Sequence, residues 1–121
     1  MYGFPKDLNL DGLIGHYLAQ LYLSPGSVEL IHDCDIRICA VCCPLFVFEN
    51  KILICKWDDY CRWTNADFQK LLSLNVTGWK IIADRTLEIQ YENGFSLHLV
   101  DDSDQYESVH IYFADKLSVI A

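Results

Sequence analysis

Two stretches of the chain carry nearly the same pattern, SVELIHDCDIRICAV at residues 27–41 and TLEIQYENGFSLHLV at residues 86–100. Apolar positions coincide at 28/87, 30/89, 36/95, 38/97, 40/99 and 41/100, and acidic residues coincide at 29/88 and 33/92. Each stretch has two alternating runs around a polar turn, which is typical of a β-hairpin. The common offset of 59 residues (28 to 87) predicts a single domain built from two repeats, about 8–60 and 64–121.

The rest of the chain adds strands and one short helix. Alternating runs at 45–48 and 51–56, around Glu49-Asn50, predict another hairpin, and Asn93-Gly94 predicts a type I′ turn. Thr64 or Asn65 can cap a short helix near 65–73. The expected fold class is mainly β (α+β), with pseudo-duplicated antiparallel β-hairpin units and that one helix. Either one continuous sheet or two packed sheets would satisfy the pattern.

Composition and charge limit the classes of partner. The 121 residues are 52% hydrophobic, which excludes a disordered chain. There are 9 basic and 17 acidic residues, a net charge of −8, which argues against direct binding of nucleic acid or an anionic membrane and favours a basic partner. The N-terminus does not resemble a secretory signal, and no apolar stretch is long enough to span a bilayer. We therefore expect a cytoplasmic protein.

Six cysteines, at positions 34, 39, 42, 43, 55 and 61, raise the question of a metal site. In a reducing cytosol we expect free thiols rather than disulfides. Cys39 and Cys42, followed by Cys55 and Cys61, could hold zinc, but the second pair is spaced more widely than a zinc knuckle requires. Several of these cysteines lie in apolar runs, where a thiol behaves as a small hydrophobe. We expect no cofactor and no metal.

Two acidic segments, together with Asp33 and Asp35, are candidates for binding a protein partner. The segment at 101–107 holds four acids and no base, and is interpreted either as a solvated turn or as an acidic loop that imitates nucleic-acid phosphates. A calcium site there lacks the expected glycine and terminal glutamate. The segment at 56–63 combines aromatic residues with acids, as interface anchors do. The candidate partner-binding residues are Asp33, Asp35, Asp58, Asp59, Tyr60, Asp101, Asp102, Asp104, Tyr106 and Glu107.

Catalytic motifs are not evident. His32 and Cys34 are close enough in sequence to form a nucleophilic pair, but no third residue or oxyanion-hole motif accompanies them. The chain also carries no phosphate-binding loop, dinucleotide fingerprint or nucleophile elbow. We therefore do not expect an enzyme.

The second repeat resembles a family of small bacterial two-repeat β domains. The resemblance rests on Leu71-Leu72-Ser73-Leu74, Val76, Leu87-Glu88-Ile89, Asn93-Gly94-Phe95-Ser96-Leu97 and Tyr106-Glu107. In that family a tryptophan-containing strand follows the Tyr-Glu pair, whereas this chain has Val109 in that region. The match covers the second half of the chain well and the first half loosely.

Small acidic domains of this kind are similar to the immunity proteins of contact-dependent growth inhibition and other polymorphic toxin systems. The resemblance implies binding to the C-terminal domain of one cognate toxin, often a basic nuclease, and occlusion of its active site. It carries over no catalytic residues. Exposed aromatic edge strands would also be compatible with a homodimer. The alternative function is a small-ligand or zinc-binding β domain that uses the cysteine cluster.

Overall fold

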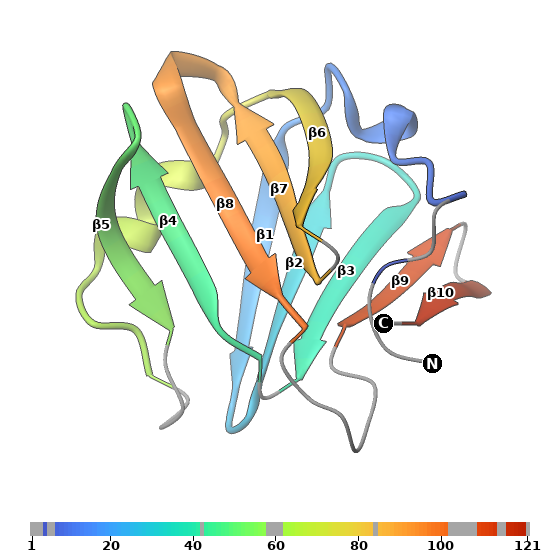
Figure 1. Cartoon of the computed structure of the whole chain (residues 1–121), viewed down its shortest axis with the longest axis horizontal. Helices are drawn as coiled ribbons and strands as arrows, with labels where there is room; N and C mark the ends of the chain where they lie inside the picture. The colour runs from blue at the N-terminus through green and yellow to red at the C-terminus, as the bar shows by residue number, and fades with distance from the viewer. Residues whose placement is uncertain are drawn as a thin grey trace.

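The computed structural model confirms a mainly β, antiparallel fold and resolves the strands into two five-stranded sheets (Figure 1). It describes residues 4, 7–41, 43–57, 62–83, 85–101, 109–113 and, for the backbone alone, 116–120. The first sheet has the order β1 (Leu18–Ser24), β2 (Ser27–His32), β3 (Ile36–Val41), β9 (Val109–Phe113) and β10 (Lys116–Ile120). The second sheet has the order β5 (Ile52–Trp57), β4 (Leu45–Glu49), β8 (Phe95–Val100), β7 (Thr86–Tyr91) and β6 (Val76–Ala83).

The duplicated pattern corresponds to two equivalent hairpins. Adding the offset of 59 to the bounds of β2 and β3 gives 86–91 and 95–100, which are the bounds of β7 and β8. The edge strands β1 and β6 precede them in the two halves of the chain. Each sheet therefore contains one three-stranded meander, β1-β2-β3 or β6-β7-β8, from one repeat.

Each sheet is completed by strands from the other repeat. The hairpin β4–β5 follows β3 along the chain but joins the second sheet, where β4 pairs with β8. The hairpin β9–β10 follows β8 but joins the first sheet, where β9 pairs with β3. Figure 1 shows the two sheets layered one over the other, with β4 and β9 beside the meander of the other repeat. The repeats are thus interleaved rather than placed side by side.

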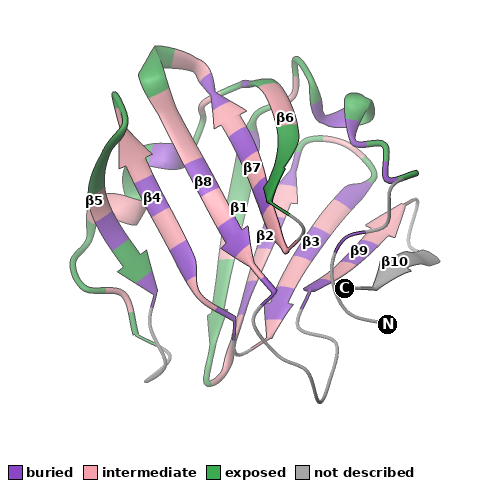
Figure 2. Ribbon diagram, viewed as in Figure 1, coloured by how far each residue is buried: buried purple, intermediate pink, exposed green. Residues whose placement is uncertain are grey.

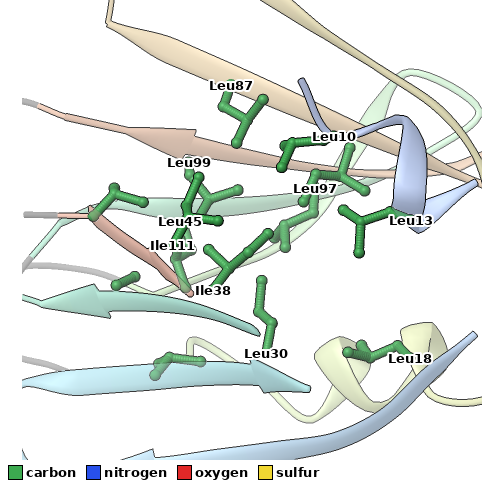
Figure 3. Packing of buried hydrophobic residues seen from close by; sticks show 14 of the residues in the cluster. Leu10, Leu13, Leu18, Leu30, Ile38, Leu45, Leu87, Leu97, Leu99 and Ile111 are labelled. Atoms are coloured by element: carbon green, nitrogen blue, oxygen red, sulfur yellow. The ribbon is translucent and has the colours of Figure 1, made fainter. Parts of the chain in front are cut away.

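One apolar core fills the space between the sheets. Buried and partly exposed residues alternate along β2, β3, β7 and β8, as expected of strands with one face against a core (Figure 2). The inward side chains of both sheets belong to a single hydrophobic cluster (Figure 3). Fully buried members include Leu30, Ile38, Leu45, Leu97 and Ile111. Burial of this apolar surface is the main force that holds the two sheets together.

The short helix expected near 65–73 is a 3-10 turn, η2 (Asp67–Leu71), rather than an α-helix. Asn65 Oδ1 accepts a hydrogen bond from the Asp67 backbone N–H at 2.7 Å, which starts the turn. Leu72 is already extended, and Ser73 has a φ of 72°, so the chain leaves the helical path at once to reach β6. The other helical segments, η1 (Asp11–Leu13) and η3 (Glu92–Gly94), are also 3-10 turns. In the ranges that the structure describes, no helix has the length and apolarity needed to cross a membrane.

Two tight turns meet at one end of the second sheet. Asn93 and Gly94 have φ values of 65° and 82°, which confirms the type I′ turn predicted from Asn-Gly. The turn of the β4–β5 hairpin lies at Asn50-Lys51, with φ values of 52° and 68°, one residue later than the sequence pattern indicated. The Asn50 N–H donates to the Gly94 carbonyl at 2.9 Å, so the two turns support one another.

We expect Gly94→Ala to destabilise the fold more than Gly15→Ala. Both glycines have positive φ, 82° and 88°, so each alanine carries a backbone cost of about 1–2 kcal/mol. A Cβ at Gly94 would in addition collide with the Asn50 side chain, whereas a Cβ at Gly15 meets no atom within 4 Å. Urea unfolding of the two variants measures the difference. Equal losses would show that the Asn50 side chain moves aside without cost.

The two ends of the sandwich differ in structure. At one end, here called the hairpin end, lie the turns β2–β3, β4–β5 and β7–β8. At the other, here called the crossover end, lie the turns β1–β2 and β6–β7 and the residues where the chain passes from one sheet to the other. The Val100 N–H donates to the Pro44 carbonyl at 3.1 Å there, beside both passages.

Candidate functional site

The described candidate residues lie at opposite ends of the sandwich. Asp33 and Asp35 are exposed and lie in the β2–β3 turn, at the hairpin end. Asp101 directly follows β8, at the crossover end. Asp33 and Asp35 therefore do not share a surface with Asp101. The remaining candidates lie outside the described residues: Asp58, Asp59, Tyr60, Asp102, Asp104, Tyr106 and Glu107.

Asp33 combines an exposed position with a structural role. Its Oδ1 accepts a hydrogen bond from the Tyr17 backbone N–H at 3.1 Å and lies 2.9 Å from His16 Nδ1. Its side chain is 36% exposed, so a partner could still reach it. Glu92, the matching acid of the second repeat, accepts from the Asn75 N–H at 3.0 Å in the same way. The coincidence of acids at 33/92 therefore reflects two equivalent contacts that hold the segments leading into β1 and β6.

Asp101 is not a surface acid, contrary to the expectation from the sequence. Its side chain is fully buried, and Oδ2 lies 3.7 Å from Arg85 Nε. Its backbone N–H donates to the Arg85 carbonyl at 2.8 Å, which ties the end of β8 to the β6–β7 turn. A carboxylate that is buried beside an arginine has a structural role and is not accessible to a binding partner.

A pocket of about 710 Å³ opens at the crossover end between edge strand β1 and the chain that follows β5. The lining residues are Leu23, Ser24, Pro25, Gly26, Trp57, Arg62 and Trp63, and we call this set the tryptophan pocket. Its volume falls in the range usual for small-ligand pockets, about 300–1,000 Å³. Apolar and aromatic walls with a single guanidinium suit the side chains of a protein partner.

The two tryptophans are fixed by the core rather than free. Trp57 is 2% exposed, and the Trp63 ring stacks on Phe68 with centroids 4.6 Å apart and planes at 16°. The Trp63 Nε1 is buried and has no hydrogen-bond partner among the described residues. Burial of Trp57 and stacking of Trp63 on Phe68 therefore hold this wall of the pocket in place.

Edge strand β1 presents two residues that the sequence interpretation did not single out. Tyr22 and Leu23 are 52% and 53% exposed and lie at the end of the strand that borders the tryptophan pocket. The signal was the run Leu21-Tyr22-Leu23, which lacks the alternation of a strand with one polar face. Such a run on an edge strand indicates a surface available for association.

The outer faces of the two sheets carry equivalent rows of polar side chains. In the first sheet Glu29, Cys39 and His110 are cross-strand neighbours. In the second sheet Glu88 lies opposite His98, with Oε2 and Nε2 2.8 Å apart. Burial alone would raise the pKa of Glu88. The hydrogen bonds from Gln90 and His98, helped by nearby positive charge, outweigh burial and hold that pKa below its ordinary value.

The thiols of Cys34 and Cys39 are poorly suited to nucleophilic attack. Burial, reinforced by Glu29, raises the pKa of the Cys39 thiol, and burial also raises the pKa of the Cys34 thiol. A thiol with a raised pKa carries little of the reactive thiolate. The nearby His32 is turned into the core, where its Nε2 lies 2.9 Å from the Tyr91 hydroxyl. The pair His32 and Cys34 therefore lacks the geometry of a general base with its nucleophile.

The described cysteines do not gather into a metal site. Cys39 projects from the outer face of the first sheet, whereas Cys55 is buried on the inner face of β5 in the second sheet. Cys34, Cys39 and Cys55 are free thiols, while Cys42 and Cys61 lie outside the described residues. Over the described ranges, no group of three or more His, Cys, Asp or Glu side chains is placed to hold a metal ion. The zinc set that would combine Cys39 with Cys55 is therefore not formed.

Comparison with known proteins finds no matching family model, no matching curated protein and no matching solved structure.

Proposed function

We propose that this chain is an immunity protein that binds a basic toxin domain and occludes its active site, and that the contact is made by Tyr22, Leu23 and the tryptophan pocket. The observation that carries the proposal is this pocket, which lies beside an exposed apolar edge strand. Rigid pockets flanked by exposed aromatic and aliphatic residues are where the binding energy of protein interfaces concentrates.

Charge supports a basic partner. The net charge of −8 would accelerate encounter with a positively charged domain. Asp58 and Asp59 lie in the sequence between Trp57 and Arg62, two of the residues that line the pocket. The aromatic residues that line the pocket would also attract a lysine or arginine of the toxin. Asp33 and Asp35, at the far end of the sandwich, would contribute to the long-range field only.

The immunity proposal predicts that a charge on β1 beside the pocket weakens binding much more than a charge at the hairpin end of β5, away from the pocket. Leu23→Asp places a carboxylate at the pocket, whereas Leu53→Asp places one on edge strand β5, where Leu53 is 47% exposed. Loss of a central apolar contact costs about 2 kcal/mol or more, so we expect the Kd of Leu23→Asp to rise at least about 30-fold. The matched control Leu53→Asp should change the Kd by less than about threefold.

The experiment uses the full-length chain and the toxin domain encoded by the neighbouring upstream gene, co-expressed and titrated by calorimetry at two salt concentrations. A 1:1 complex that weakens as salt rises, together with toxin inhibition that Leu23→Asp relieves, would support the proposal. Equal effects of the two variants would remove β1 and the pocket from the interface. Absence of binding to any basic domain, with the pocket instead taking a small apolar ligand in a thermal-shift screen, would favour the small-ligand alternative.

A further inference from the structure

Neither repeat can complete its own sheets. Within one repeat, the meander β1-β2-β3 ends at β3, and the hairpin β4–β5 lies in the other sheet with β4 unpaired on one side. Both missing neighbours, β9 and β8, come from the second repeat. An isolated repeat would therefore expose two strand edges that are central in the folded protein, in addition to the apolar face of its meander.

The segments that lead into β1 and β6 also cross between the repeats. The Gly15 N–H donates to the Val76 carbonyl and the Val76 N–H donates to the His16 carbonyl, both at 2.8 Å. The Ser73 N–H donates to the Leu18 carbonyl at 2.9 Å, and the Leu18 N–H donates to the Leu74 carbonyl at 3.2 Å. These reciprocal bonds add a third backbone connection to the β3–β9 and β4–β8 ladders.

His32 and Tyr91 occupy the same position in the two repeats, because they are 59 residues apart and each ends the second strand of its meander. Their side chains contact each other in the core, with ring centroids 6.0 Å apart and planes at 11°. A residue that meets its own equivalent marks a twofold axis, as in the isologous interfaces of symmetric dimers. The arrangement inside this one chain is therefore that of a dimer with exchanged hairpins.

We infer that this chain can recognise a second copy of itself, with the first repeat of one copy pairing with the second repeat of the other. The interface is the one already present within the chain: the β3–β9 and β4–β8 ladders, the crossing lead-in segments and the shared core. No new contact is required, because each intramolecular contact is reproduced between copies. The connection between repeats favours the closed monomer only through an effective concentration on the order of millimolar.

The test is complementation between two full-length variants. Ile38→Asp places a charge in the core of the first repeat, and Leu97→Asp places one at the equivalent position of the second; both native side chains are fully buried. Each variant alone should be unfolded, because an unpaired buried carboxylate costs as much as the total stability of a small domain. Diluted together from denaturant, they should form a heterodimer with about half the native circular dichroism per chain, since one intact repeat comes from each.

The matched control combines Ile38→Asp with Leu30→Asp, which both damage the first repeat. This mixture should stay unfolded, because no intact first repeat is present. A second measurement does not depend on the variants: the wild-type chain is refolded at micromolar and at millimolar concentration, and its oligomeric state is measured by sedimentation. A dimer is expected only at the higher concentration. Failure of the first mixture to fold, or wild-type chain that stays monomeric at both concentrations, would overturn the inference.

Discussion

Asp101→Ala should lower the free energy of unfolding by about 3 kcal/mol, the largest effect that we expect from a single acidic residue. Removing one member of a buried ion pair leaves the other charge without its counterion, at a typical cost of about 3–5 kcal/mol. Because Arg85 is 32% exposed and partly solvated, the lower end of that range applies. Urea unfolding at pH 7 measures the loss.

Asp35→Asn is the control for that measurement. Asp35 was grouped with Asp101 as a binding residue in the sequence interpretation, but it is exposed in the β2–β3 turn. An exposed polar replacement should change stability by no more than about 0.5 kcal/mol. If Asp101→Ala is equally mild, the carboxylate does not stabilise the crossover end. Binding studies that reverse the charge of the 101–107 segment should therefore leave Asp101 unchanged.

Acidification from pH 7.5 to pH 5 should lower the free energy of unfolding of the wild-type protein. The decrease should be about 2 kcal/mol larger than in the His32→Phe variant. Burial disfavours the charged imidazolium and lowers the pKa of His32 from its ordinary 6.5 to about 4; Asp33 opposes this shift, and His16 adds to it. In the unfolded chain the imidazole binds a proton below about pH 6.5, whereas the folded chain keeps it neutral until about pH 4. Stability is therefore lost between these two values as the pH falls.

The His32 prediction is measured by urea unfolding of both proteins at several pH values. Other groups titrate in the same range, so the difference between the two curves isolates His32. The phenyl ring of the variant keeps the ring contact with Tyr91 but cannot titrate. Parallel curves would mean that the imidazole becomes charged in the folded protein without penalty, for instance through opening of the core around Tyr91.

The repeated hairpins could be predicted because their determinants are local. Alternation along residues 27–41 and 86–100 marked the strands, and Asn93-Gly94 marked a turn that only residues tolerant of positive φ can form. The helix expected near 65–73 is only a 3-10 turn, although Phe68, Leu71 and Leu72 have helical spacing. In the structure Leu72 is 37% exposed, and the positive φ of Ser73 ends the turn.

The interleaving of the repeats could not be predicted, because it depends on contacts between strands far apart in the chain. Nothing in residues 36–49 indicates that β4 leaves the sheet of β3, although Pro44 marks a break between the two strands. The pairing of β3 with β9 and of β4 with β8 is decided by how two similar repeats bury their faces together. Local pattern carries no information on that choice.

The burial of Asp101 could have been predicted from the alternation of inward and outward residues along β8. Leu97, Leu99 and Asp101 are two residues apart and share the inward face of β8 and its continuation. The neighbouring acids at 102, 104 and 107 suggested a uniform polar loop instead. The same rule places His32 after Val28 and Leu30 on the inward face of β2. An ionisable residue that continues an inward series is a candidate for burial, whatever its neighbours are.

The interleaved order of the strands has a consequence for synthesis on the ribosome. The meander β1-β2-β3 emerges early, but its outer neighbour β9 begins only at Val109. The edge of β3 therefore stays unpaired until nearly the whole chain has been synthesised. The nascent protein must therefore expose an unpaired strand and half of an apolar core while translation continues, which are the conditions under which chaperones bind and neighbouring nascent chains aggregate. Slow release of the chain from the ribosome, or close spacing of ribosomes on one messenger RNA, should lower the yield of this protein. The loss should be larger than for a domain whose repeats fold one after the other.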